Sequence, residues 1–219
     1  MLIDKWIIFD FDGTLADTLP VWVDTWNFLA NKYGYKIIES EDYPRLKAMS
    51  SLAIKAELGI PWRRLLPLER EGRKKFAEQF ASHQLYPGIA EMVKKLKQQG
   101  FGLAILTSNA LETVEACLKS NHCDGVFNFI YAGNPLFEKG GKLKKLLKEH
   151  NIGLSQAIYV GDETRDIDAG RLAGIRVASV TWGVNTKEIL LAHHPDFLAE
   201  KPEQLLEVFK PRGSSSQRG

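Results

Sequence analysis

Two aspartates, Asp10 and Asp12, are separated by a single residue and follow the apolar run over residues 7–9. A run that is apolar at every position is typical of a strand buried on both faces of a parallel sheet. Gly13 follows and permits a sharp turn. Open α/β sheets bind ligands at the carboxyl ends of their strands. Two carboxylates there repel each other unless a cation lies between them, and Mg²⁺ prefers such oxygen ligands. The segment therefore predicts a cation site.

The same segment can also be read as a strand that ends in an ordinary Asp-Gly turn. A plain turn predicts nothing further along the chain, whereas a site predicts more polar groups at other strand ends. Those groups are present. Residues 107–109 (Thr-Ser-Asn) follow one apolar run. Residues 161–166 (Gly-Asp-Glu-Thr-Arg-Asp) follow another. Lys139 lies between the two.

In order, the four segments resemble the four motifs of the haloacid dehalogenase superfamily: DxDGT, a strand that ends in Thr or Ser, a lysine, and GDxxxD. The resemblance covers residues 4–209. Residues 17–20 (Asp-Thr-Leu-Pro) and the return at Gly88 resemble the phosphoglycolate phosphatase-like branch, which carries a helical C1 cap.

The resemblance implies that Asp10 is a nucleophile that forms an aspartyl-phosphate and that Asp12 is a general acid and base. The residue pattern alone does not tell these two roles apart. The resemblance also implies a Mg²⁺ site made of Asp10, the backbone carbonyl of Asp12, and Asp162. An aspartate at position 12 favours phosphoryl transfer over dehalogenation. The dehalogenases of this superfamily carry a different residue there, because their reaction has no leaving oxygen to protonate.

Further residues receive supporting roles from the same resemblance. Phosphate binding falls to Thr107, Ser108 and Asn109, the hydroxyl of Thr107 acting with the backbone N–H of Ser108. A surrounding layer near the metal falls to Asp166, Glu163 and Thr14. Asp166 also fits an N-cap of the following helix, and Thr14 fits a local turn cap.

The lysine of the third motif has two candidates. Lys139 precedes two glycines and can point toward the sheet edge, where it would offset the charge of a phosphate and of Asp10. The family often has a proline soon after this lysine, and here Gly140 and Gly141 follow. Lys142 is therefore the alternative, although it belongs to a lysine-rich run that is typical of a solvated helix face.

Composition excludes several classes of function. The formal net charge of the 219-residue chain is +2, which gives no basic field for nucleic acid. No apolar run reaches membrane-spanning length, and no signal-peptide pattern opens the chain. We therefore expect a cytoplasmic protein in which Cys117 and Cys123 are free thiols. Oligomeric state stays open.

The coarse pattern predicts a doubly wound α/β fold. From residue 88 onward, helical and strand patterns alternate and end with a strand over residues 175–180. Residues between the first motif and this region show helical patterns only. We expect an α/β core over residues 1–15 and 87–210, a helical cap over residues 16–86, and a flexible tail over residues 211–219.

The sequence thus predicts a Mg²⁺-dependent phosphatase that hydrolyses a small phosphorylated metabolite. One rival is a phosphomutase of the β-phosphoglucomutase type, which has the same motifs. A rival from another class is a non-catalytic phosphate-binding protein on the same scaffold.

Overall fold

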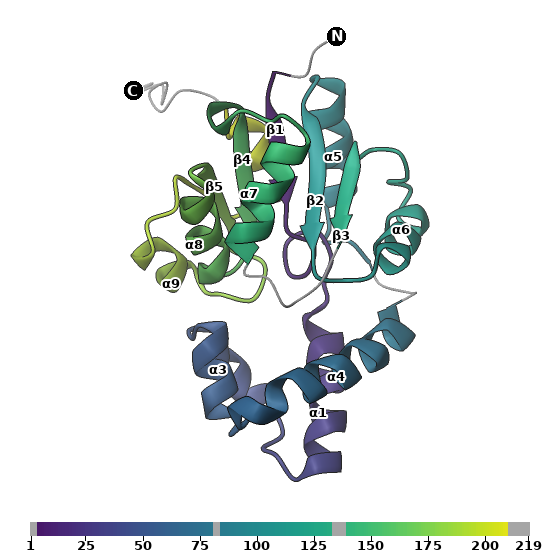
Figure 1. Cartoon of the computed structure of the whole chain (residues 1–219), viewed down its shortest axis with the longest axis vertical. Helices are drawn as coiled ribbons and strands as arrows, with labels where there is room; N and C mark the ends of the chain where they lie inside the picture. Colours follow the sequence, from purple (N-terminus) through teal and green to yellow (C-terminus); the bar gives the residue numbers. More distant parts are fainter. Residues whose placement is uncertain (1–3, 81–83, 133–138, 210–219) are drawn as a thin grey trace, which may run out of the picture.

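The computed structural model describes residues 4–80, 84–132 and 139–209 of the chain. Its centre is a sheet of six parallel strands in the order β3-β2-β1-β4-β5-β6 (Figure 1). The strands are β1 (Trp6–Phe9), β2 (Gly102–Thr107), β3 (Phe129–Ala132), β4 (Ala157–Gly161), β5 (Arg176–Val180) and β6 (Phe197–Ala199). The predicted doubly wound α/β fold is confirmed. The expected tail over residues 211–219 lies outside the described residues.

β1 is a central strand, although it is the first in the chain. It pairs with β2 on one side and with β4 on the other, so Phe9 lies between Ile105 and Val160. Strand order reverses at this point, because the chain first builds β2 and β3 on one side and then crosses to β4 on the other. Asp10 and Asp162 therefore follow neighbouring strands at the switch point, which is where open α/β sheets bind ligands.

Helices cover both faces of the sheet. Successive strand side chains point to opposite faces, so Ile7 and Phe9 pack on one side and Ile8 on the other. The first face is covered by α5 (Ile89–Gln98) and α6 (Leu111–Ser120), and the second by α7 (Lys139–Glu149) and α8 (Thr164–Ala173). These four helices agree with the predicted alternation of helices and strands.

The expectation that residues 175–180 form the last strand is wrong. After β5 come α9 (Lys187–Ala192), the edge strand β6 and a 3₁₀ helix, η4 (Pro202–Glu207). β6 spans three residues and α9 six. Elements this short carry too few residues for a periodic pattern, which explains why the sequence did not predict them.

Four helices lie apart from the sheet, beyond the carboxyl ends of its strands (Figure 1). We call them the helical group: α1 (Leu19–Tyr33), α2 (Tyr43–Lys47), α3 (Ser51–Glu57) and α4 (Leu65–Phe80). The remaining 3₁₀ helices are η1 (Ser40–Asp42), η2 (Trp62–Arg64) and η3 (Leu154–Gln156). The group has its own apolar cluster, which includes Trp26, Leu46 and Leu58. No strand occurs among its described residues, as the sequence predicted.

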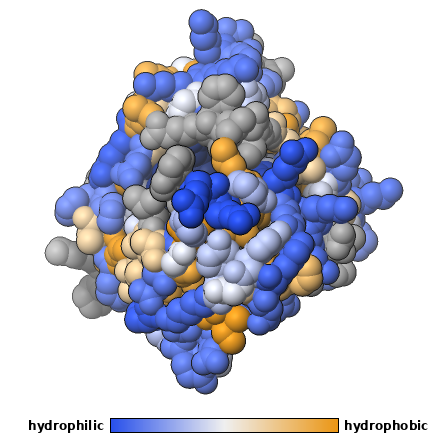
Figure 2. All heavy atoms as spheres, turned by 60° about the horizontal axis from the view of Figure 1, so that its bottom comes forward, coloured by the Kyte–Doolittle hydropathy of each residue, from blue (hydrophilic) through white to orange (hydrophobic). Residues whose placement is uncertain are grey.

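Two chain segments join the helical group to the sheet. Asp17 N donates to Gln84 O at 3.2 Å, and Tyr86 N donates to Leu15 O at 2.9 Å. Hydrogen bonds between the two segments therefore hold the crossings side by side. The face that Figure 2 brings forward is mostly hydrophilic, with hydrophobic residues scattered among polar ones. Among the described residues, no helix is long and apolar enough to cross a membrane.

Candidate active site

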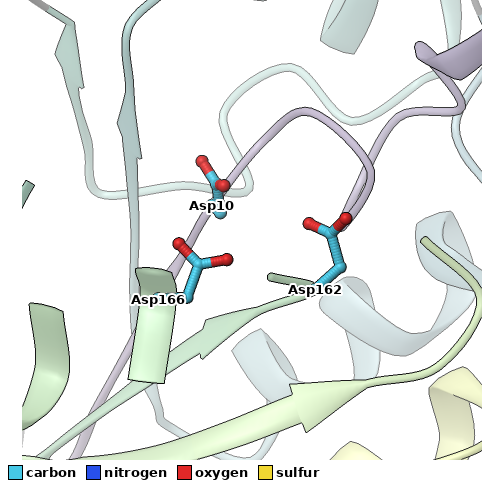
Figure 3. A group of neighbouring side chains, drawn as sticks. All are labelled: Asp10, Asp162 and Asp166. Atoms are coloured by element: carbon cyan, nitrogen blue, oxygen red, sulfur yellow. The ribbon is translucent and has the colours of Figure 1, made fainter. Parts of the chain in front are cut away.

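Three carboxylates from separate elements meet at the carboxyl edge of the sheet (Figure 3). Asp10 follows β1, Asp162 follows β4, and Asp166 lies in the first turn of α8. All three are buried, and one oxygen from each lies within 4.8 Å of the others. The structure therefore brings together two of the three predicted metal ligands, and it adds the carboxylate of Asp166 to them.

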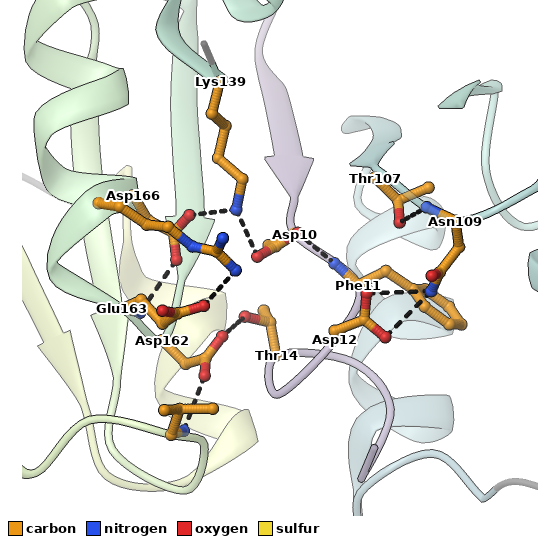
Figure 4. A network of polar contacts seen from close by, with 12 residues as sticks. Asp10, Phe11, Asp12, Thr14, Thr107, Asn109, Lys139, Asp162, Glu163 and Asp166 are labelled. Carbon is orange, nitrogen blue, oxygen red and sulfur yellow. Dashed lines mark hydrogen bonds and ion pairs between the residues drawn. The ribbon is translucent and has the colours of Figure 1, made fainter. Parts of the chain in front are cut away.

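Lys139 lies between two of these carboxylates (Figure 4). Its Nζ is 2.6 Å from Asp10 Oδ2 and 2.5 Å from Asp166 Oδ1. The remaining oxygens are held by backbone, because Phe11 N donates to Asp10 Oδ1 and Glu163 N donates to Asp166 Oδ2, each at 2.9 Å. Both carboxylates are thereby fixed in orientation.

Lys139, not Lys142, is the lysine that reaches Asp10. The structure places Lys139 as the first residue of α7, whereas the sequence placed it before that helix. Gly140 is buried against α8, and a Cβ built there would lie 2.6 Å from Leu172 Cδ2. This close approach explains why a glycine follows the lysine. Lys142 lies one helical turn further on and is half-buried.

Asp162 is completely buried beneath the first motif. Thr14 Oγ1 donates to its Oδ1 at 2.8 Å, and Val184 N donates to its Oδ2 at 2.7 Å. Gly13 has a φ of 72°, and a Cβ there would lie 2.2 Å from Asp162 Oδ2. A glycine is therefore required both for the backbone conformation and for the approach of the carboxylate.

Asp12 lies on the opposite side of Asp10 from the cluster (Figure 4). Asn109 Nδ2 lies 3.0 Å from each of its carboxylate oxygens, and Asn109 N donates to Thr107 Oγ1 at 3.0 Å. Asn109 was predicted to bind phosphate, yet its amide contacts Asp12. The buried hydroxyl of Thr107 and the exposed Ser108 lie at the end of β2, as the sequence predicted.

Burial and crowding shape the electrostatics of the site. Burial raises the pKa of Asp10 to about 7, against the opposing effect of Lys139. Burial, together with Glu163, Asp166 and Asp10, holds the pKa of Asp162 well above its ordinary value. Burial also raises the pKa of Asp12, although Asn109 counteracts it. Acidic groups so placed hold protons more tightly than free aspartates, because burial disfavours the charged form and neighbouring carboxylates add to this effect at Asp10 and Asp162.

Lys139 has the reverse behaviour. Burial alone would lower its pKa, but Asp10 and Asp166 raise it well above the ordinary value. Lys139 therefore stays charged. Glu163, which the sequence placed near the metal, is buried and forms an ion pair with Arg165 rather than joining the carboxylate cluster.

Sequence reasoning missed two contributions to the site. The first is the loop over residues 182–186, called the 182–186 loop, from which Trp182 Nε1 donates to Thr14 O at 2.9 Å. A Cβ on Gly183 would lie 2.3 Å from Gly13 O, so this loop packs directly on the first motif. The Trp-Gly pair just after a buried strand was the available signal.

The second missed contribution is Arg73, from α4 of the helical group. Its Nη1 donates to the carbonyl of Ser108, and its Nη2 lies 3.0 Å from Glu69 Oε1. Its Nε is buried and has no hydrogen-bond partner. Burial lowers the pKa of Lys142, and the nearby positive charges of Arg73 and Lys139 lower it further. A cation of the helical group thus faces the end of β2.

Comparison with known proteins agrees with this geometry. Residues 7–180 match the family model described as haloacid dehalogenase-like hydrolase. The chain belongs to this family. The haloacid dehalogenase-like chain is 38% identical over 203 residues to a phosphoglycolate phosphatase of Synechococcus elongatus, covering 92% of this chain and 95% of the relative. It is 27% identical to a putative pyrophosphatase PpaX of Caldanaerobacter subterraneus, covering 93% and 94%.

A solved structure shows the same fold. The crystal structure of a predicted phosphatase from Clostridium acetobutylicum has a TM-score of 0.80 at 20% identity and covers 94% of this chain and 100% of that one. Members of the haloacid dehalogenase-like family generally use a divalent metal. The donor set here fits such an ion, because three buried carboxylates converge and the pKa values of Asp10 and Asp162 are raised there.

Proposed function

We propose that this chain is a Mg²⁺-dependent phosphatase that hydrolyses a small phosphate monoester through an aspartyl-phosphate on Asp10. The observation that carries the proposal is the position of Asp10. It lies between the carboxylate cluster with Lys139 on one side and Asp12 with Asn109 on the other. A nucleophile is thus flanked by a cation site and by a proton carrier, which is what phosphoryl transfer requires.

Asp10 would attack the phosphorus atom with one carboxylate oxygen while the ester P–O bond breaks. The contacts from Phe11 N and Lys139 fix the carboxylate before the reaction, so little reorientation is needed. Lys139 also offsets the negative charge that gathers when a phosphate approaches a carboxylate.

Asp12 would donate a proton to the departing ester oxygen. It would then take a proton from water as that water attacks the phosphorus and the Asp10–phosphorus linkage breaks, releasing phosphate. A raised pKa suits this donor, because it retains its proton closer to neutral pH. We propose that Asn109 orients Asp12, and that Thr107 and the backbone N–H of Ser108 contact the phosphate.

The carboxylates of Asp10 and Asp162, with the backbone carbonyl of Asp12, would hold Mg²⁺. This ion supplies charge neutralisation for the phosphate oxygens when it is bound. Asp166 also faces this position, while its contacts to Lys139 and Glu163 N keep both of its oxygens occupied. We propose that Asp166 supports the metal site through Lys139 rather than as a principal ligand.

We further propose that residues 16–86 act as a cap domain. The helical group lies over the carboxyl edge of the sheet and carries its own apolar cluster, so it can move as a unit. The bridged crossings at Asp17 and Tyr86 are its natural hinges. Closure of the cap would exclude bulk water before attack on the phosphorus.

The proposed substrate class is a phosphate ester with a second anionic group, such as phosphoglycolate. Support comes from Arg73, a cation at the end of β2, and from Lys142, which lies near enough to Arg73 for their charges to interact. The names of relatives point the same way, because phosphoglycolate and pyrophosphate both carry negative charge next to the transferred phosphate.

Phosphate release from a panel of esters tests the proposal. The panel contains phosphoglycolate, pyrophosphate, a sugar phosphate and p-nitrophenyl phosphate, each with Mg²⁺ and with a chelator. We expect release that requires Mg²⁺ and falls at least about 10³-fold in Asp10→Asn, because the nucleophile is lost. Asp168→Asn, which changes an exposed carboxylate two residues beyond Asp166, is the matched control and should retain activity.

Other outcomes would point to the rivals. A sugar phosphate that is isomerised without release of phosphate would identify a phosphomutase. Binding of phosphate esters without any turnover in the wild-type protein would favour a non-catalytic role. Equal activity in Asp10→Asn and wild type would contradict the nucleophile assignment.

A further inference from the structure

Asn185, in the 182–186 loop between β5 and α9, is 1% exposed. A buried side-chain amide must find partners for its oxygen and for its two N–H groups, because an unsatisfied polar group is costly inside a protein. The partners of Asn185 come from two separate parts of the molecule, the helical group and α8.

On the side of the helical group, Asn185 Nδ2 donates to the carbonyls of Lys47 and Met49 at 3.1 and 2.9 Å. Thr186 N donates to the Lys47 carbonyl as well, at 3.0 Å. These carbonyls lie where α2 ends, and helix C-termini leave carbonyls without partners inside the helix. The 182–186 loop satisfies them from outside the helical group.

On the side of the sheet, Asn185 Oδ1 accepts a hydrogen bond from Thr164 N, the first residue of α8, at 2.9 Å. The neighbouring Val184 N donates to Asp162 Oδ2, and Asn185 N donates to the Asp162 carbonyl at 3.2 Å. One short loop therefore contacts the buried carboxylate of Asp162 and the end of α2 together.

This contact is independent of the covalent connections to the helical group. The crossings lie at residues 15–17 and 84–86, whereas the loop contacts residues 47–49. A rotation of the helical group about its crossings separates residues 47–49 from the loop, and the three hydrogen bonds between them must break.

We propose that Asn185 is a positioning residue that latches the helical group closed over the acidic edge of the sheet and couples closure to the environment of Asp162. The kinetic consequence rests on the proposed phosphatase function, whereas the latch itself does not. If only the closed form binds substrate productively, the apparent affinity scales with the closed fraction.

The variant Asn185→Asp isolates the latch. Aspartate keeps the shape of the side chain and an acceptor for Thr164 N, but it replaces the two donated hydrogen bonds with an oxygen that faces two carbonyls. Loss of two hydrogen bonds shifts the closing equilibrium by roughly tenfold or more. We expect KM for phosphoglycolate to rise by up to about that factor, the full factor applying when the open form predominates, while kcat changes less than about threefold.

Hydrogen–deuterium exchange of the full chain gives a readout that needs no turnover. We expect Asn185→Asp to speed exchange in peptides that cover residues 43–58, because the end of α2 loses its outside partners. Asn27→Asp is the matched control. Asn27 also bonds a backbone carbonyl and N–H, both of Ile38, but entirely within the helical group.

A second variant leaves Asn185 unchanged. Thr186→Pro removes the backbone donor to the Lys47 carbonyl and places the proline ring against that carbonyl, while the φ of −70° at this position suits proline. We expect its effects on KM and on exchange to be in the same direction as those of Asn185→Asp.

Unchanged exchange over residues 43–58 in a folded Asn185→Asp protein would overturn the latch, whatever the enzyme activity. A change in KM no greater than that of Asn27→Asp would overturn the coupling of the latch to substrate binding. Absence of turnover in the wild type would instead contradict the proposed function, and the exchange result would still decide the latch.

Discussion

Arg73 differs from Lys139, the cation that contacts Asp10, because Arg73 comes from the helical group and not from the edge of the sheet. It contacts the carbonyl of Ser108 and the carboxylate of Glu69, and its Nε is buried without a partner. A guanidinium presents five donors in a fork that suits a carboxylate or phosphate. An anionic group on a substrate would complete the bonding that the protein leaves unfilled.

Replacement of Arg73 tests this reading. We expect Arg73→Met to lower kcat/KM for phosphoglycolate by roughly 10- to 100-fold, the effect of losing a hydrogen bond to a charged group. Turnover of p-nitrophenyl phosphate, which lacks the second anion, should change less than about threefold. Arg70→Met removes the same charge from an exposed position on α4 and is the control. Equal losses for both substrates would contradict the assignment.

The sequence predicted the residues whose positions follow from strand ends and missed those whose positions follow from docking. Asp10, Thr107 and Asp162 could be found because parallel strands end at one edge. Arg73 and Asn185 could not, because their partners lie on other elements and no local pattern announces a contact between distant segments. Their roles depend on how the helical group sits over the sheet.

Among the secondary-structure elements, the packing of α7 against α8 determines where Lys139 lies. The helices approach each other so closely at Gly140 that a Cβ there would lie 3.0 Å from Leu172 Cβ, whereas a Cβ on Gly141 would meet nothing within 4 Å. Packing therefore requires a glycine at position 140 but not at position 141.

Alanine substitutions at the two glycines test this difference. We expect Gly140→Ala to lower the free energy of unfolding by about 1–3 kcal/mol, because the added methyl group overpacks the contact with Leu172. Gly141→Ala should be neutral or should raise it by up to about 1 kcal/mol, because alanine favours the helix. Urea denaturation of both variants measures the difference. A stabilising Gly140→Ala would show that the two helices can move apart freely.

At the element scale, long periodic segments were predictable and short ones were not. The helices α5 and α6 have apolar residues at helical spacing, so their approximate positions were predictable. β6 and α9 are held by pairing with β5 and packing on α8, which are tertiary contacts. Lys139 was placed outside its helix because the two glycines that follow it are poor helix formers.

For the whole molecule, the acidic edge links stability to pH. Burial raises the pKa of Asp10 from an ordinary 3.8 to about 7, and the pKa of Asp162 rises as well. Between these values the folded protein binds more protons than the unfolded chain. The free energy of unfolding contributed by Asp10 is fully present below about pH 3.8 and is lost as the pH rises through about 7, and Asp162 contributes in the same direction.

The melting temperature of the metal-free protein should therefore fall between about pH 5 and about pH 8, with a smaller fall in Asp10→Asn. Mg²⁺ should raise the melting temperature more at the higher pH, because the ion competes with protons for the same carboxylates. Differential scanning calorimetry with and without Mg²⁺ checks both statements. A steeper fall in Asp10→Asn than in the wild type would contradict the assignment to Asp10.

The central place of β1 in the sheet has a consequence for the order of events during synthesis. β1 leaves the ribosome before the other described strands, yet its partners in the sheet are β2 and β4, at residues 102–107 and 157–161. The helical group, by contrast, has its own apolar cluster within residues 19–60 and can begin to compact while the later strands are still being translated. Asp10, the proposed nucleophile, therefore reaches its final position only after residues 157–161 have been made.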